Sequence, residues 1–199
     1  PPPTSDMLTA LCKEFGIKDG DFIIGSVGRV FDDCKRFSDL IRAMPAVLAQ
    51  HPQARLMIVG DGPDRSMLEK LCVTLGVGNS VIFAEYRSDV RTFYPLMDIF
   101  ALASAHEAFG LVFVEAMFAE VPIIGTEVGG IPFVLDSGRC GALVPPLAPL
   151  SLSRTLSDLI ASPSLRAEYA RLGLARAREE FSAERYCREI DELYISLIR

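Results

Sequence analysis

Short apolar runs alternate with longer amphipathic stretches along this chain of 199 residues. The short runs are nearly continuous and strand-sized, as expected of strands buried on both faces. The longer stretches place apolar residues at helical spacing, and one of them carries Leu40, Ile41, Met44 and Val47 on one side. This alternation predicts βαβ units, in which a parallel sheet is covered by helices on both faces.

The same pattern gives bounds for each element. Strands are expected at 22–27, 55–59, 80–84, 99–103, 122–125 and 142–144. Helices are expected at 6–15, 37–50, 63–75, 88–94, 109–119, 150–160, 164–180 and 183–198. Pro63 suits the first turn of its helix, with Asp61 as the cap. We therefore predict a Rossmann-like, three-layer α/β domain with a parallel six-stranded sheet and a helical C-terminal tail.

The chain divides into three parts on this pattern. Residues 1–20 form a proline-led linker and the first helix, residues 21–181 form the domain that contains the sheet, and residues 182–199 form a final helix. The last three helices follow one another without strands. We expect the final helix to pack elsewhere, toward a domain that this sequence does not contain.

Charge and cysteine usage narrow the class of protein. The net charge of -6, with acidic and basic residues well mixed, argues against non-specific nucleic-acid binding. The five cysteines form no CxxC pair and there are only two histidines, which favours a reducing compartment and no metal site. No apolar stretch approaches the ~20 residues of a membrane span, and no signal peptide opens the sequence. We expect a cytoplasmic protein.

The segment from Ser104 to Met117 joins a strand to a helix that begins near Gly110. This helix is apolar nearly all round, which predicts that it is buried, and a buried carboxylate at Glu115 needs a partner. Free N–H groups and the positive dipole end suit a phosphate at the helix tip. Glu115 lies about 8 Å further along the axis, at ~1.5 Å per residue, where a ribose would follow a diphosphate. A structural Glu115 held by a core Arg or Lys explains the composition equally well.

A second loop, after the first strand, carries two cations. Arg29 and Lys35 could neutralise a pyrophosphate at the carboxyl edge of the sheet. The loop contains neither GxGxxG nor GxxxxGK[ST], and a solvated surface loop explains it as well. Asp32 and Asp33 raise the alternative of a metal-binding pair, but no third ligand accompanies them.

Two further loops at this edge of the sheet, and one histidine, each allow both a structural and a functional interpretation. Gly60 to Pro63 permits a tight turn from strand to helix, and a purely structural turn is favoured there. Gly129-Gly130-Ile131-Pro132 allows either close approach to a ligand or a plain loop. His106 is a candidate acid or base, although a lone histidine is more often structural.

Together and in this order, these segments resemble the C-terminal, donor-binding domain of the retaining GT-B glycosyltransferases of the E-x7-E family, which is family-4-like and called group 1. That family shows glycine-arginine followed by lysine, then G-D-G-P, then E-x7-E, then paired glycines with proline. The matching residues are Gly28-Arg29 with Lys35, Val59 to Pro63, Glu107 with Glu115, and Gly129 to Pro132. The resemblance covers roughly Ile23 to Val144, and only the combined pattern is specific.

The resemblance implies residue roles. Arg29 and Lys35 would hold the donor diphosphate and support the leaving group, and Glu107 would contact the donor sugar near the reacting face. Glu115 would accept hydrogen bonds from the ribose hydroxyls. The implied catalytic set is therefore Glu107, Arg29 and Lys35. The other implied donor contacts are Tyr86 and Arg87 near the base, His106, and the backbone of Phe109, Gly110, Leu111 and Val112.

The resemblance also implies a reaction. A glycosyl group, hexosyl or N-acetylhexosaminyl, would pass with retention from a nucleoside diphosphate to an acceptor hydroxyl, without a metal, in polysaccharide, O-antigen or glycolipid synthesis. On family grounds, UDP is the expected nucleotide of the donor. The acceptor would bind mainly to an N-terminal domain absent here, so this chain alone would transfer little, and a full-length enzyme would be free to associate with the inner face of the membrane. A GT-B-type sugar-nucleotide epimerase and a non-catalytic nucleotide-binding module are the alternatives; the Glu107–Glu115 spacing disfavours the first.

Three positions depart from the family pattern. Arg36 stands where a glycine usually follows the lysine, and Glu120 replaces a glycine common after the E-x7-E helix. Phe133 replaces an acidic residue common after the paired glycines. These departures leave the identity of the donor open.

Overall fold

The structure, a computed structural model, describes residues 3–198 and contains one parallel sheet of six strands. The strands are β1 (Phe22–Val27), β2 (Ala54–Val59), β3 (Val81–Phe83), β4 (Ile99–Leu102), β5 (Ile123–Thr126) and β6 (Ala142–Val144). The helices are α1 (Ser5–Glu14), α2 (Asp32–Lys35), α3 (Phe37–Gln50), α4 (Arg65–Thr74), α5 (Leu111–Phe118), α6 (Ile131–Val134), α7 (Pro149–Ala161), α8 (Pro163–Glu180) and α9 (Ala183–Ile198). The predicted fold class is confirmed.

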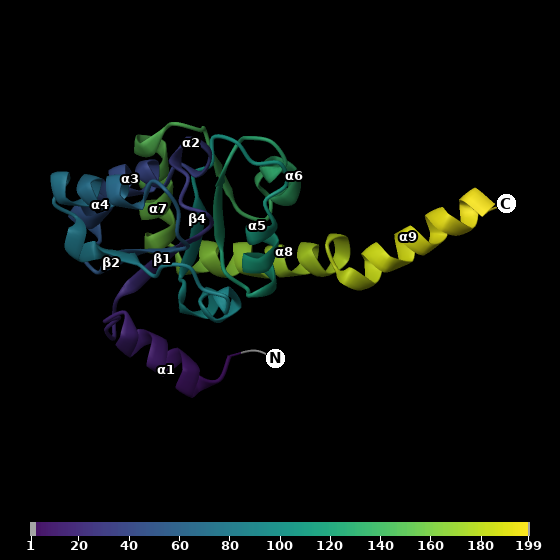
Figure 1. Ribbon diagram of the computed structural model, residues 1–199, viewed down its shortest axis with the longest axis horizontal. Helices are drawn as coiled ribbons and strands as arrows, with labels where there is room; N and C mark the ends of the chain where they lie inside the picture. Colours follow the sequence, from purple (N-terminus) through teal and green to yellow (C-terminus); the bar gives the residue numbers. More distant parts are fainter. Residues whose placement is uncertain (1–2, 199) are drawn as a thin grey trace.

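The sheet runs in the order β3-β2-β1-β4-β5-β6, and every pair of neighbours is parallel. The chain therefore moves outward from β1 to β3, returns to the other side of β1, and then moves outward again to β6. Right-handed crossovers in opposite directions put α3 and α4 on one face and α5 on the other (Figure 1). The strand order reverses between β1 and β4, and ligands of such sheets bind outside the carboxyl ends of the strands at this point.

The core follows from the apolar strands. Every residue of β4 is buried, as are all but the first of β1. On one face α3 packs against α4 and α7, and on the other α5 packs against α8. Aromatic rings fill the second face, where Phe100 of β4 meets Phe113 of α5 edge-on at 5.5 Å between ring centroids.

Several predicted element bounds are wrong, each for a local reason. The fourth helix begins at Arg65, because Asp61 and Pro63 belong to the preceding turn, where Asp61 Oδ1 accepts a hydrogen bond from the Gly62 N–H at 2.8 Å. The helix expected at 88–94 is two 3₁₀ turns, and Pro95 restricts the conformation of the residue before it. The plain loop considered after Gly130 contains α6, and the short helix α2 was not foreseen.

The helix expected at 109–119 starts at Leu111, because Gly110 is left-handed with φ of 87°. Its apolar composition also overstated its burial. Leu111 is 68% exposed and Phe118 is 44% exposed, so α5 has an open side. The side chain of Glu115 is half-buried rather than enclosed.

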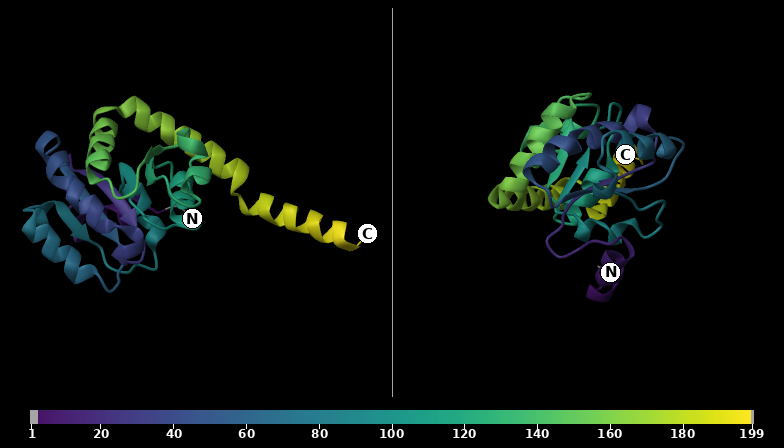
Figure 2. Two further views of the ribbon diagram at one scale, coloured as in Figure 1. Left: turned by 90° about the horizontal axis from the view of Figure 1, so that it is seen from above. Right: turned by 90° about the vertical axis from the view of Figure 1, so that its left-hand side faces the viewer.

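The final helix projects away from the sheet domain. Figure 1 and the left view of Figure 2 show α9 extending beyond the end of α8, from which it is separated at Phe181 and Ser182. None of the residues of α9 whose side chains the structure describes is buried. Its packing on another domain stays a prediction, as does the division into three parts. Among residues 3–198, no helix combines the length and the hydrophobicity that crossing a membrane requires.

Two of the departures from the family pattern occupy left-handed backbone, which is where glycine is favoured. Arg36 has φ of 53°, and its guanidinium compensates with two hydrogen bonds to Asp39, Nε–Oδ2 at 3.1 Å and Nη2–Oδ1 at 3.0 Å. Glu120 has φ of 58° just beyond α5. There the Glu120 N–H bonds the Met117 carbonyl at 3.0 Å and the Val121 N–H bonds the Ala116 carbonyl at 3.0 Å, as in a Schellman motif.

Replacing Glu120 with glycine is expected to stabilise the protein by about 1 kcal/mol, because glycine avoids the left-handed penalty at this position. Urea unfolding measures the change. Glu168→Gly, in the interior of α8 and exposed, is the matched control and is expected to destabilise by about 1 kcal/mol. A loss of stability in both variants would contradict the assignment of strain to Glu120.

Candidate functional site

The loops after β1 and β4 meet where the strand order reverses. The backbone N–H groups of Ala105 and His106 both donate to the carbonyl of Cys34, at 2.8 and 3.3 Å. This tie brings the Lys35 ammonium onto Glu107 Oε2 in an ion pair. The side chain of Lys35 is 23% exposed and that of Glu107 is 12% exposed. Two residues predicted for the catalytic set are therefore neighbours, although 72 positions separate them in sequence.

The paired glycines after β5 pack against the Glu107 loop. A Cβ on Gly129 would overlap the carbonyl oxygen of Glu107, and one on Gly130 would press on the backbone of Ala108 and Phe109. The Gly130 N–H donates to the Glu107 carbonyl at 3.2 Å. These glycines let two segments of the protein approach each other closely. This packing accounts for the paired glycines, and no ligand is needed to explain them.

The glycines after β2 hold the first loop in the same way. A Cβ on Gly60 would overlap the carbonyl of Gly28, and one on Gly62 would overlap the carbonyl of Val30. The Gly28 and Val30 N–H groups donate to carbonyls of the β2 segment, both at 3.0 Å. The turn is structural, as favoured from sequence, and it fixes the backbone on both sides of Arg29.

A cavity of about 450 Å³ lies over the carboxyl ends of β1 and β2. It brings together three predicted donor contacts, Arg29, Tyr86 and Arg87. Tyr86 is 76% exposed, so its ring is free to meet a ligand. The remaining lining residues are Val27, Gly28, Val59, Gly60, Asp61 and Val90.

Arg87 lines this cavity, but its charge is already engaged. Its guanidinium pairs with Glu14 of α1 at 2.8 Å and with Asp89 at 3.0 Å, and lies 5.1 Å from the centroid of the Phe93 ring. The hydrogen bonds to Asp89 raise the pKa of Arg87 and lower the pKa of the Asp89 carboxyl. Arg87 therefore anchors α1 to the cavity wall, a role that the sequence did not indicate.

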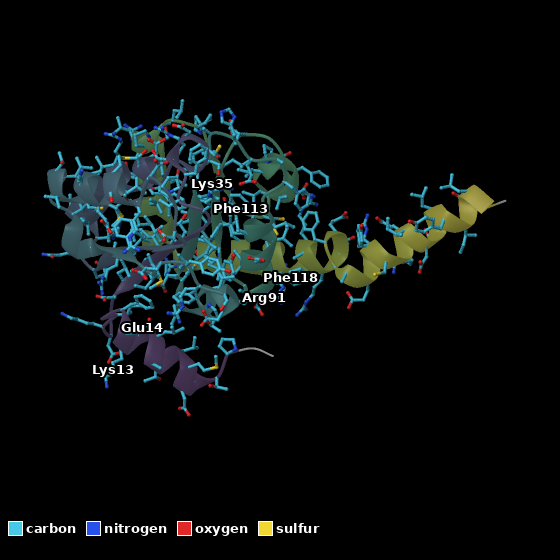
Figure 3. The ribbon with its side chains drawn as sticks, viewed as in Figure 1. Lys13, Glu14, Lys35, Arg91, Phe113 and Phe118 are labelled. Carbon is cyan, nitrogen blue, oxygen red and sulfur yellow. The ribbon has the colours of Figure 1, made fainter. Side chains whose placement is uncertain are left out.

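Glu115 lines a second cavity of about 660 Å³ and is not among the residues that line the first. Its carboxylate oxygen Oε2 accepts a hydrogen bond from the Tyr94 hydroxyl at 2.7 Å. The partner is thus a tyrosine, and the core Arg or Lys considered from sequence is wrong. The same segment contributes to both cavities, with Val90 lining the first and Arg91 the second. Figure 3 shows Lys35 and Arg91 toward opposite ends of the region around α5.

The other predicted contacts lie around the start of α5. The first-turn N–H groups of α5, those of Leu111 and Val112, lack acceptors within the helix. Phe109 and Leu111 turn their side chains to a third cavity, next to Phe133 and Phe181. The centroid of the Phe133 ring lies 6.5 Å from that of Phe109 and 6.1 Å from that of Phe181. Phe133, which replaces the acidic residue of the family pattern, is therefore part of an aromatic cluster.

The remaining polar candidates are His106 and the aspartates considered as a metal-binding pair. His106 is exposed, and its side chain bonds none of the residues 3–198. Asp32, considered as half of a metal pair, accepts a hydrogen bond from the Ser38 N–H at 2.8 Å. In the part of the chain that the structure describes, no group of three or more His, Cys, Asp or Glu side chains is placed to hold a metal.

Comparison with known proteins gives this arrangement a family. The model described as "Glycosyl transferases group 1" matches residues 9–174, which include all six strands and every loop at their carboxyl edge. The chain belongs to the group 1 glycosyltransferases. The range ends within α8 and leaves α9 outside.

The curated relatives that match this group 1 domain are longer than the chain. The N-acetyl-alpha-D-glucosaminyl L-malate synthase of Bacillus anthracis is 29% identical over 96% of this chain and 50% of the relative. The lipopolysaccharide core biosynthesis glycosyltransferase LpsE of Rhizobium meliloti is 31% identical over 88% of this chain and 49% of the relative. The chain spans about half the length of the curated relatives that it matches.

One of the similar solved structures contains a bound nucleotide. Anabaena Alr3699/HepE in complex with UDP matches with a TM-score of 0.87 and 25% identity, over 98% of this chain and 54% of that protein. The same protein was also solved in complex with UDP-glucose, where the TM-score is 0.84. A glycosyltransferase from Rickettsia africae, at 20% identity and a TM-score of 0.89, shares the fold.

Sequence reasoning about this group 1 domain missed Tyr94. The tyrosine was expected to end a short helix, whereas it opens a 3₁₀ turn and is 1% exposed. One signal was available, because a buried tyrosine needs a partner for its hydroxyl and Glu115 was predicted as a buried carboxylate in need of one. Only the packing of the segment after β3 against α5 could pair the two.

Proposed function

We propose that this chain is the donor-binding domain of a glycosyltransferase that transfers a glycosyl group from a nucleoside diphosphate sugar to an acceptor hydroxyl. The observation that carries the proposal is the Lys35–Glu107 ion pair at the point where the strand order reverses, with Arg29 lining the adjacent cavity from the same loop as Lys35. Positive charge at this edge suits a diphosphate, and the N-terminus of α5 adds first-turn N–H groups. UDP is the first nucleotide to test, because HepE was solved with UDP and UDP-glucose.

Each group has a place in the proposed transfer. Arg29 and Lys35 would stabilise the negative charge that develops on the departing diphosphate, a task that such enzymes assign to cations. The Glu107 carboxylate, oriented by Lys35, would contact the donor sugar. Glu115 would bind the ribose hydroxyls. We propose that the configuration of the anomeric carbon is retained and that these cations make a bound metal unnecessary.

The proposal also covers the acceptor and the location of the full-length enzyme. The curated relatives are about twice as long as this chain, and LpsE acts in lipopolysaccharide core synthesis. We propose an N-terminal acceptor domain, an acceptor in polysaccharide or glycolipid synthesis, and a cytoplasmic enzyme associated with the inner face of the membrane. The five cysteines, all free, support a reducing compartment.

A thermal-shift and calorimetric panel of UDP-, GDP- and ADP-sugars on this domain tests the proposal. One of the three is expected to bind, and at about 100 times its Kd it should raise Tm by roughly 5 °C or more. The nucleosides alone are the control and are expected to bind much more weakly, because they lack the diphosphate. No response to any sugar nucleotide would favour a non-catalytic module with a dead site.

A further inference from the structure

Tyr94 connects two parts of the site that lie far apart in sequence. It belongs to the segment after β3, which continues from the Tyr86–Arg87 cavity wall, and its side chain reaches α5. Its ring is buried, 5.9 Å from that of Phe100, and its hydroxyl lies 2.7 Å from Glu115 Oε2. The tyrosine therefore touches a candidate ligand-binding carboxylate, while only 1% of its own surface is exposed.

The hydroxyl of Tyr94 has one better acceptor. Its distance to the Val112 carbonyl is 3.4 Å, much longer than the 2.7 Å to the Glu115 carboxylate. Short hydrogen bonds to a charged oxygen are the stronger kind. Burial, followed by the hydrogen bond to Glu115, raises the pKa of Tyr94, so the group stays protonated and donates.

The second oxygen of Glu115 remains available. Oε1 accepts no hydrogen bond from residues 3–198, and it is not among their buried polar atoms without a partner. Glu115 lines the second cavity together with Tyr94 and Arg91. One oxygen is thus held from inside the protein and the other is open to an incoming hydroxyl.

We propose that Tyr94 is a positioning residue, whose hydroxyl holds Glu115 Oε2 so that Oε1 meets the ribose hydroxyls of the donor nucleotide. The inference rests on the proposed function. A glutamate side chain that is already oriented loses less rotamer freedom on binding, and this preorganisation appears as affinity. One segment then lines the cavity at Tyr86 and Val90 and also sets the ribose anchor.

The test compares Tyr94→Phe with the wild type on two ligands. The first is whichever of UDP, GDP and ADP binds best, and the second is its 2′,3′-dideoxy analogue. Calorimetry should show that Tyr94→Phe binds the ribose ligand about tenfold more weakly, the scale of a lost hydrogen bond to a charged group, while affinity for the analogue changes by less than about twofold. The ring and its contacts remain in this variant, so a stable fold is expected.

A double-mutant cycle shows whether Tyr94 acts through Glu115. Glu115→Gln is expected to weaken ribose binding, and the Tyr94→Phe, Glu115→Gln double variant is expected to lose little more than the larger single loss. Tyr169→Phe is the matched control: it removes the hydroxyl of a half-buried tyrosine on α8, outside all three cavities, and should bind both ligands as the wild type does.

The outcomes separate the two proposals. Equal losses for both ligands, no loss, or additive losses in the cycle would overturn the positioning role and leave the donor-binding function standing. A wild type that binds the diphosphate without preferring the ribose would do the same. A wild type that binds none of the three nucleoside diphosphates overturns the proposed function, and the positioning role with it.

Discussion

Gly129→Ala is expected to destabilise the domain by about 3 kcal/mol, the sum of a left-handed alanine and an overpacked contact. Gly129 has φ of 51°, and a Cβ there would overlap the carbonyl oxygen of Glu107. The Glu107 loop must move to admit the methyl group, and Lys35 pairs with that glutamate. Urea unfolding should show the loss of stability, and calorimetry should show weaker binding of the nucleoside diphosphate.

A matched glycine separates backbone strain from the overlap. Gly16 has φ of 60°, and nothing lies within 4 Å of the position of its Cβ. Gly16→Ala is expected to cost only the left-handed penalty of about 1–2 kcal/mol and to leave binding unchanged. Equal losses of stability in the two variants, with intact binding in both, would show that the Glu107 loop does not depend on Gly129.

Lys35→Ala is expected to weaken diphosphate binding by about 2–3 kcal/mol, roughly 30- to 150-fold, because the proposed role is a charge-assisted hydrogen bond in a half-buried site. The substitution also leaves Glu107 without its cation, and an unpaired carboxylate repels a diphosphate. Affinity for the nucleoside should stay within about twofold. Calorimetry with the nucleoside diphosphate and the nucleoside measures both.

The control for Lys35→Ala is Lys70→Ala, which removes the same charge from the exposed side of α4. It should leave both affinities unchanged, apart from a small effect of net charge that added salt screens. Equal losses for diphosphate and nucleoside in Lys35→Ala would remove Lys35 from the phosphate site.

The sheet was predictable because each strand carries its own signal. β1 and β6 have the expected bounds, β2 and β4 differ by one residue at one end, and β3 and β5 differ by one residue at both ends. Doubly buried strands must be apolar along their whole length, so composition marks them locally. The helices α3 and α9 also match their predicted ranges, since their amphipathic periods need no tertiary information.

The candidate site was only partly predictable. A parallel sheet brings the ends of its strands to one edge, which is why Arg29, Lys35 and Glu107 could be expected near one another. The strands do not say which side chains then bond. Arg87 was expected at the base and is engaged by Glu14 and Asp89, and Glu115 proved to have Tyr94 as its partner.

The sequence by itself determined the fold class and the four loops that meet at the sheet edge, because periodicity and glycine motifs are local properties. The tertiary structure alone decided what those motifs do. Gly129 and Gly60 admit the backbone of another loop, Glu120 occupies a glycine conformation, and Tyr94 holds Glu115. Each of these depends on atoms brought within contact distance by packing, and contacts across such separations leave no periodic trace in the chain.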